Sequence, residues 1–118
     1  MQHTDKNYEI QMNSINEKLI KMSSILEEQF SKALKVISTR DENLANDIIE
    51  TDKQINDLNH DISDTVFQII AMRQPMADDL RFLFCSIKII RDLERIGDHL
   101  VTVAKKGYRI NSSIPPEF

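Results

Sequence analysis

Glycine and proline are scarce in this sequence, with 2 Gly and 3 Pro among 118 residues. An all-β fold needs frequent tight turns, and those turns rely on these two residue types. Cysteine is scarcer still, because Cys85 stands alone and cannot form a disulfide within the chain. Its apolar surroundings in residues 80–85 predict a buried, reduced thiol. The composition therefore favours a helical protein of the cytoplasm.

Clusters of basic residues and long apolar runs are also missing. The net charge is −4 and no group of Lys and Arg stands out along the chain. Phosphate binding needs a basic face, so we expect no nucleic-acid partner. No segment reaches the roughly 18 uncharged apolar residues of a membrane-spanning helix. The polar start of the chain also lacks the apolar core of a signal peptide.

Apolar residues recur at steps of three and four in three long segments, a spacing typical of α-helices. The predicted helices span residues 8–37, 42–72 and 76–108. In the first helix the expected core stripe is Tyr8, Met12, Ile15, Leu19, Met22, Leu26, Phe30, Ala33 and Ile37. The third helix is apolar over much of its circumference. We therefore expect it to contact more than one neighbour.

The breaks between these segments are short. Thr39 or Asp41 is expected to cap the second helix by accepting backbone N–H bonds. Pro75 should end that helix, because the residue before a proline resists the α conformation, and it suits the first turn of the third. Short connections make neighbouring helices antiparallel. The sequence predicts an all-α, up-down-up three-helix bundle over residues 1–110, followed by a tail or linker at 111–118.

Acidic residues interrupt the apolar stripes of the second and third helices. Asp52 stands where the second stripe calls for an apolar residue, between Ile48 and Ile55. In the third helix Glu94 and Asp98 are four residues apart and therefore share one face. Carboxylates in an apolar stripe are unfavourable unless a cation or hydrogen-bond donor meets them. The two interruptions are the strongest functional signal in the sequence.

Counting outward from Pro75 places these polar residues at one level. Asp52 should lie opposite Asp98, and Asn56 opposite Glu94, so the four oxygen-bearing side chains form a candidate metal site. Such a donor set suits iron, manganese, magnesium or calcium, with zinc as a further option. The alternative is that Glu94 and Asp98 form salt bridges with Arg91, Arg95 or a lysine of the first helix. A glycine within a helix costs about 1 kcal/mol, so Gly97 indicates a close approach by a neighbouring helix or a ligand.

Three segments resemble the PhoU family of phosphate-regulon regulators. They are Arg-Gln-Pro-Met-Ala-Asp-Asp-Leu-Arg at 73–81, Asp-Leu-Glu-Arg-Ile-Gly-Asp-His at 92–99, and Asp-Lys-Gln-Ile-Asn at 52–56. The similarity extends over roughly residues 9–110. It matches one repeat of three antiparallel helices, whereas family members usually carry two. The resemblance implies that this chain corresponds to the first repeat.

The resemblance also implies a function. Family members are cytoplasmic, non-enzymatic negative regulators that link the ATPase subunit of a phosphate ABC transporter to a sensor histidine kinase. They meet the membrane only through such partners. Several bind iron or other metals through paired acidic motifs, which here correspond to Asp52, Asn56, Glu94 and Asp98. Asn56 departs from the family's acid and removes one negative charge. We expect iron or zinc there.

Two other functional classes stay open at this stage. One is a structural or oligomerisation module whose acids are solvated. The other is an enzyme that uses a carboxylate-bound metal, which would need an open coordination position and a positioned base. A lone repeat with a broadly apolar third helix is also expected to form a homo-oligomer, with a second copy in place of the missing half.

Overall fold

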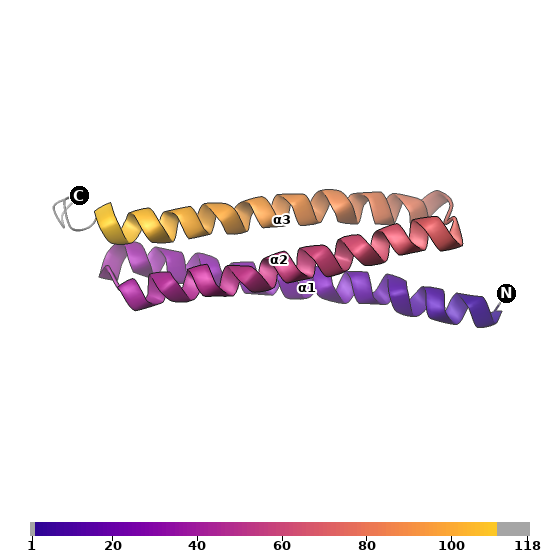
Figure 1. Cartoon of the computed structure of the whole chain (residues 1–118), viewed down its shortest axis with the longest axis horizontal. Helices are drawn as coiled ribbons and strands as arrows, with labels where there is room; N and C mark the ends of the chain where they lie inside the picture. The colour runs from indigo at the N-terminus through magenta and orange to yellow at the C-terminus, as the bar shows by residue number, and fades with distance from the viewer. Residues whose placement is uncertain (1, 111–118) are drawn as a thin grey trace.

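The computed structural model describes residues 2–110, and the side chains of residues 6–108. Three helices make up this part of the chain: α1 (Gln2–Thr39), α2 (Glu42–Arg73) and α3 (Ala77–Ile110). Each contacts both others, and together they form a rod of 65 × 20 × 17 Å (Figure 1). The predicted up-down-up bundle is confirmed. The predicted tail at 111–118 lies outside the described residues.

The turns between the helices form largely as expected. Asp41 is the N-cap of α2, and its carboxylate accepts a hydrogen bond of 3.1 Å from the Leu44 backbone N–H. Thr39 belongs to α1 instead, where its hydroxyl donates to the Lys35 carbonyl. Gln74 ends α2 in the left-handed conformation, with φ of 50°, and Pro75 follows it. The expectation that Pro75 lies in the first turn of α3 is wrong, since α3 begins at Ala77.

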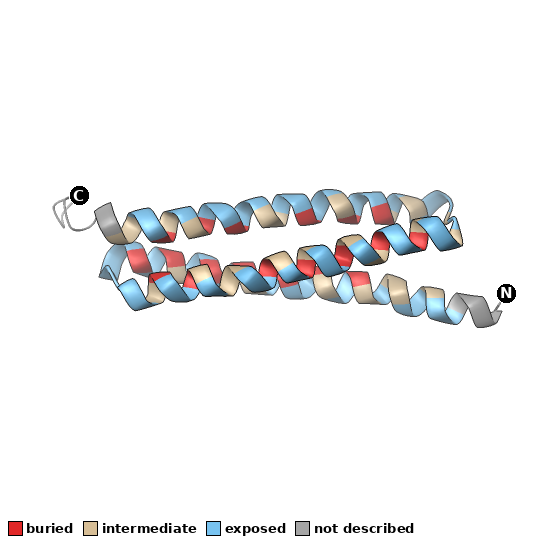
Figure 2. Ribbon diagram, viewed as in Figure 1, coloured by how far each residue is buried: buried red, intermediate tan, exposed pale blue. Residues whose placement is uncertain are grey.

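The core runs along the inner faces of all three helices (Figure 2). Its buried apolar residues are Ile15, Leu19, Met22, Leu26, Ala33, Val36, Ala45, Ile48, Ile55, Leu58, Ile62, Val66, Ile69, Leu83, Ile90, Leu100 and Ala104. The α2 stripe is the one that the spacing predicted from Ile48 to Ile69. No helix in the described range has a stretch apolar enough to cross a membrane.

The second half of α1 departs from the predicted stripe. Phe30 is 56% exposed and Ile37 is 45% exposed, while Gln29 and Val36 are buried in their place. Gln29 tolerates burial because its amide nitrogen donates to the Ile48 carbonyl of α2 at 2.8 Å. After Leu26 the core face therefore continues at residues 29, 33 and 36. A count of apolar residues alone skips the buried glutamine, and it places the stripe one position too late at residues 30 and 37 although Ala33 is buried as predicted.

Cys85 is exposed, so the prediction of a buried thiol is wrong. The inward position next to it belongs to Ser86, which is 1% exposed and donates to the Phe82 carbonyl at 2.8 Å. Residues 82–84 next to Cys85 are apolar and suggested burial, but Arg81 and Lys88, four residues before it and three after it, share its helix face. The core of α3 follows residues 83, 86 and 90, and this phase turns residue 85 outward.

Candidate functional site

The register of α2 against α3 brings Asp52 to the level of Gly97. A Cβ built on Gly97 would lie 2.8 Å from the Asp52 Oδ1, 3.5 Å from Leu26 and 3.6 Å from Ile55. Counting outward from Pro75 predicted Asp98 as the residue opposite Asp52, which is one position away. Gly97 therefore marks a close approach in which the carboxylate of α2 lies against the α3 backbone. Any side chain at residue 97 would compete with that carboxylate for space.

Asp52 is half-buried and its Oδ1 atom has no hydrogen-bond partner. Burial raises the pKa of the Asp52 carboxyl, and the charges of Asp98 and then Glu94 raise this pKa further. The three acids therefore act on one another electrostatically, as the sequence predicted. An orphaned, partly desolvated carboxylate oxygen beside two other acids is unfavourable in isolation. Asp52 therefore carries an electrostatic penalty at the contact between α2 and α3, which we call the α2–α3 seam.

Glu94 accepts a hydrogen bond of 2.9 Å from the Asn59 side-chain amide. Asn56, the expected neighbour of Glu94, lies one turn earlier on α2. Asn59 was missed because only the Asp52–Asn56 pair was matched with the pair on α3. Continuing the same spacing by three more residues would have found it. The polar face of α2 is therefore longer than the predicted site.

The salt-bridge alternative is wrong for the side chains that the structure describes. The ion pairs in this part of the chain join Lys18 to Asp61, Lys32 to Asp47, Lys53 to Glu50 and Arg81 to Asp78. None of them involves Glu94 or Asp98. The negative charge of the seam acids is thus not neutralised by lysine or arginine within residues 6–108. Apart from the Glu94 oxygen that accepts from Asn59, water or a cation is left to meet these oxygens.

The side chains of the α2–α3 seam are of types that bind cations, but they do not lie close enough together to form a metal site. Carboxylate and amide oxygens are ligands for hard and borderline cations, and the Asp52 Oδ1 has an unused lone pair. Among the described residues, however, no three His, Cys, Asp or Glu side chains group closely enough to hold a metal ion. Metal binding here would require these side chains to come closer together than they lie in the structure.

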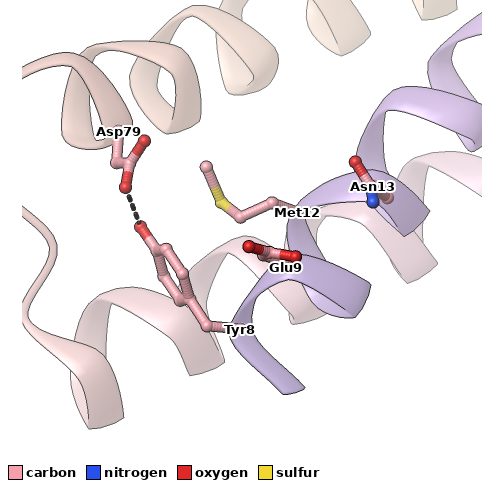
Figure 3. A pocket seen from close by; sticks show the side chains of 5 residues that line it. All are labelled: Tyr8, Glu9, Met12, Asn13 and Asp79. Carbon is pink, nitrogen blue, oxygen red and sulfur yellow. Dashed lines mark hydrogen bonds between the residues drawn. The ribbon is translucent and has the colours of Figure 1, made fainter. Parts of the chain in front are cut away.

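A second polar feature closes the opposite end of the bundle. The Tyr8 hydroxyl of α1 donates to the Asp79 carboxylate in the first turn of α3 at 2.7 Å (Figure 3). Glu9, Met12 and Asn13 complete a cavity of about 560 Å³ beside this bond. Burial, the hydrogen bond and the Asp79 charge raise the pKa of Tyr8 to about 12. Tyr8 therefore stays protonated at neutral pH and ties α1 to the start of α3.

The fold and the seam define a class, a long antiparallel three-helix bundle with acidic residues opposite a helix glycine. The model of the PhoU domain matches residues 19–107, which is most of the chain. The chain belongs to the PhoU family. All three segments on which the resemblance rested lie within the matched range.

Curated relatives support the same conclusion. The phosphate-specific transport system accessory protein PhoU homolog of Clostridium acetobutylicum is 39% identical over 92% of this chain and 50% of its own length. The homolog of Xylella fastidiosa strain 9a5c is 37% identical over 97% of this chain and 48% of its own. The phosphate-specific transport system accessory protein PhoU of Escherichia coli strain K12 is 36% identical over 81% of this chain and 40% of its own length. The chain thus spans about half the length of these relatives. No solved structure matched it.

Proposed function

We propose that this chain acts as a non-enzymatic accessory protein of phosphate transport that lowers phosphate uptake and phosphate-regulon signalling. The observation that carries this proposal is its membership of the PhoU family, together with relatives named as phosphate-specific transport system accessory proteins. In this role it works in the cytoplasm. It docks on the ATPase subunit of a phosphate ABC transporter and on a sensor histidine kinase.

Deleting the gene tests the regulatory role. Phosphate-starvation genes should become expressed in phosphate-rich medium, because the kinase would no longer receive the signal that phosphate is plentiful. Expression from a phosphate-regulon reporter is the measurement, and supplying the gene on a plasmid is the control. Full repression in the deletion strain would overturn the proposal. A catalytic role is the competing class, and it would show as substrate turnover that disappears with Glu94 and Asp98.

A metal-dependent form of this regulation is a second proposal. It rests on the Asp52 Oδ1, which has no partner, and on the unneutralised acids beside it. Asp52, Glu94 and Asp98 would supply carboxylate oxygens, and Asn56 a carbonyl oxygen, to iron or zinc. A bound cation would remove the mutual repulsion of the acids and hold α2 and α3 at a fixed distance.

Elemental analysis tests the metal proposal directly. Protein purified without chelator or metal-affinity resin should contain iron or zinc in a fixed ratio to the chain. A Glu94→Ala/Asp98→Ala double variant should contain none, whereas an Asp57→Ala/Asp64→Ala variant, which removes two exposed acids of α2, should retain the metal. Thermal unfolding provides a second measurement, since a ligand at about 100 times its Kd stabilises the folded state by about 2.7 kcal/mol. Equal metal content in wild type and the seam double variant would contradict the assignment.

Self-association is the third part of the proposal. Phe30, Leu34 and Ile37 of α1 and Ile89 and Ile96 of α3 are large, apolar and between 43% and 56% exposed. Leu26, Phe30, Leu93 and Ile96 also line a groove of about 440 Å³ between these two helices. Exposed apolar area of this kind marks an interaction surface. We expect a second copy to cover it, and a monomer at micromolar concentration in analytical ultracentrifugation would exclude this.

A further inference from the structure

A second groove is lined by residues of α3 alone, and three of its six lining residues are basic. Phe84, Ile87, Lys88, Arg91, Asp92 and Arg95 enclose about 470 Å³. Phe84, Lys88, Arg91 and Arg95 follow one another at steps of four, three and four, so they share one face of the helix. The helix thus brings Lys88, Arg91 and Arg95 onto one face, although they are not adjacent in the sequence. We call this surface the α3 cationic groove.

The cations of this groove have no partner within the described part of the chain. Lys18, Lys32, Lys53 and Arg81 each pair with a carboxylate, whereas no ion pair involves Lys88, Arg91 or Arg95. All three are exposed. The protein carries a net charge of −4, so acids were available to neutralise them. Asp92 is the single acid of the groove, which leaves three positive charges against one negative.

The groove also contains an exposed aromatic ring. Phe84 is 60% exposed, although it lies only one residue from the buried Leu83. Burying an aromatic side chain removes a large apolar area from water, so a phenylalanine left in solvent forgoes that stabilisation. Arginine and aromatic residues are the types that contribute most to binding energy at protein interfaces. Their combination in one groove distinguishes it from an ordinary solvated face.

We propose that the α3 cationic groove binds an acidic amphipathic helix of a partner protein. The basic residues repeat at helical spacing over roughly 10 Å of α3, which matches acids placed on one face of a second helix. An apolar residue of that helix would cover Phe84. The proposal rests on the proposed adaptor function only for the existence of a partner protein. The chemistry of the partner segment is argued from the residues of the groove alone.

Other anions fit this surface less well. A phosphate group or a nucleic acid carries dense charge on all sides, and Asp92 in the groove and Glu94 and Asp98 beside it would repel such a ligand. A membrane surface of anionic lipids would meet the same acids. A peptide places its carboxylates only where the cations are, and it can present an apolar side chain to Phe84. Charge complementarity therefore favours a protein segment.

The probe for this proposal is a fluorescein-labelled helical peptide of about five turns with Glu on one face and a leucine next to it. Fluorescence anisotropy at low salt gives its affinity for the full chain. A Lys88→Gln/Arg91→Gln/Arg95→Gln variant should bind it roughly tenfold more weakly, because three exposed charge pairs are lost. A Phe84→Ser variant should also bind more weakly, without any change in the salt dependence. Gln and Ser at exposed positions should leave the fold intact, and far-UV circular dichroism of each variant is the check.

Matched controls separate this result from non-specific attraction. A Lys21→Gln/Lys35→Gln/Lys105→Gln variant loses the same charge from other exposed positions and should bind as wild type does. A peptide of the same composition with its Glu residues scattered around the helix should bind more weakly. Equal weakening by both triple variants, or equal binding of both peptides, would overturn the proposal. Tighter binding of duplex DNA or of phosphatidylserine vesicles than of the peptide would overturn it as well. Failure here would leave the reporter result for the regulatory role unaffected, so the two proposals can fail separately.

Discussion

Replacing Gly97 with leucine is expected to lower the free energy of unfolding by about 2–3 kcal/mol, the upper part of the range for overpacking a close contact. The new Cβ alone would lie 2.8 Å from the Asp52 Oδ1, and the branched end of leucine would meet Leu26 and Ile55. The gain in helix propensity of about 1 kcal/mol offsets only part of this. Thermal unfolding followed at 222 nm should show a melting temperature lower by roughly 10 °C.

Two alanine variants provide the matched comparison for this prediction. Gly97→Ala and Gly107→Ala make the same chemical change in the same helix. At residue 107 the new Cβ would lie 3.1 Å from the Ile37 Cγ1 atom, a longer approach than the 2.8 Å at residue 97, and the Ile37 side chain is 45% exposed. Gly107→Ala should therefore be neutral or stabilising, and Gly97→Ala less stable than it. A Gly97→Leu protein with wild-type stability would show that α2 and α3 do not approach closely at residue 97.

The α2–α3 seam was predictable because one short turn fixes its register. Pro75 ends α2 and the spacing of the apolar residues fixes the inward faces of both helices. Counting from the turn then placed Asp52 within one residue of its neighbour in the structure. The acids were recognisable because they interrupt otherwise regular stripes. Local rules were sufficient here, since capping, periodicity and turn length all agree.

The rest depended on contacts that the sequence does not contain. Gln29 is buried because the Ile48 carbonyl accepts its hydrogen bond, and no pattern on α1 reveals that partner. Cys85 was misplaced for a different reason, because its immediate neighbours 82–84 are apolar, whereas Arg81 and Lys88, four and three residues away, share its outward face. The α3 cationic groove was missed because its cations are separated by three and four residues. Only the turn of the helix brings them together.

Asp52, Glu94 and Asp98, which we call the acidic layer, repel one another in the folded protein. Ile48 and Ile55 are fully buried on either side of Asp52, yet the residue between them carries a charge and a raised pKa. A sequence selected only for stability would place an apolar residue at position 52. Residues that break a local rule without a compensating contact are typical of functional sites. That cost is the reason to expect a ligand at the seam.

Replacing Asp52 with leucine is expected to stabilise the metal-free protein by about 1 kcal/mol or more, because a desolvated carboxylate costs about that much. Leucine has the same branching as aspartate, so it fits against Gly97 and completes the stripe between Ile48 and Ile55. Asp52→Asn removes only the charge and should lie between leucine and wild type in urea unfolding.

The control for this series is Asp57→Asn, which removes an exposed acid from the same helix and should change stability by less than about 0.5 kcal/mol. Added iron or zinc should raise the stability of wild type and leave the Asp52→Leu protein unchanged, because the leucine cannot act as a ligand. If Asp52→Leu is less stable than wild type in the absence of metal, the Asp52 carboxylate makes a favourable contact that outweighs its repulsion by Glu94 and Asp98. In that case the seam acids are structural. If stability without metal instead decreases in the order Asp52→Leu, Asp52→Asn, wild type, the acidic layer persists at the expense of stability, as a ligand site would require.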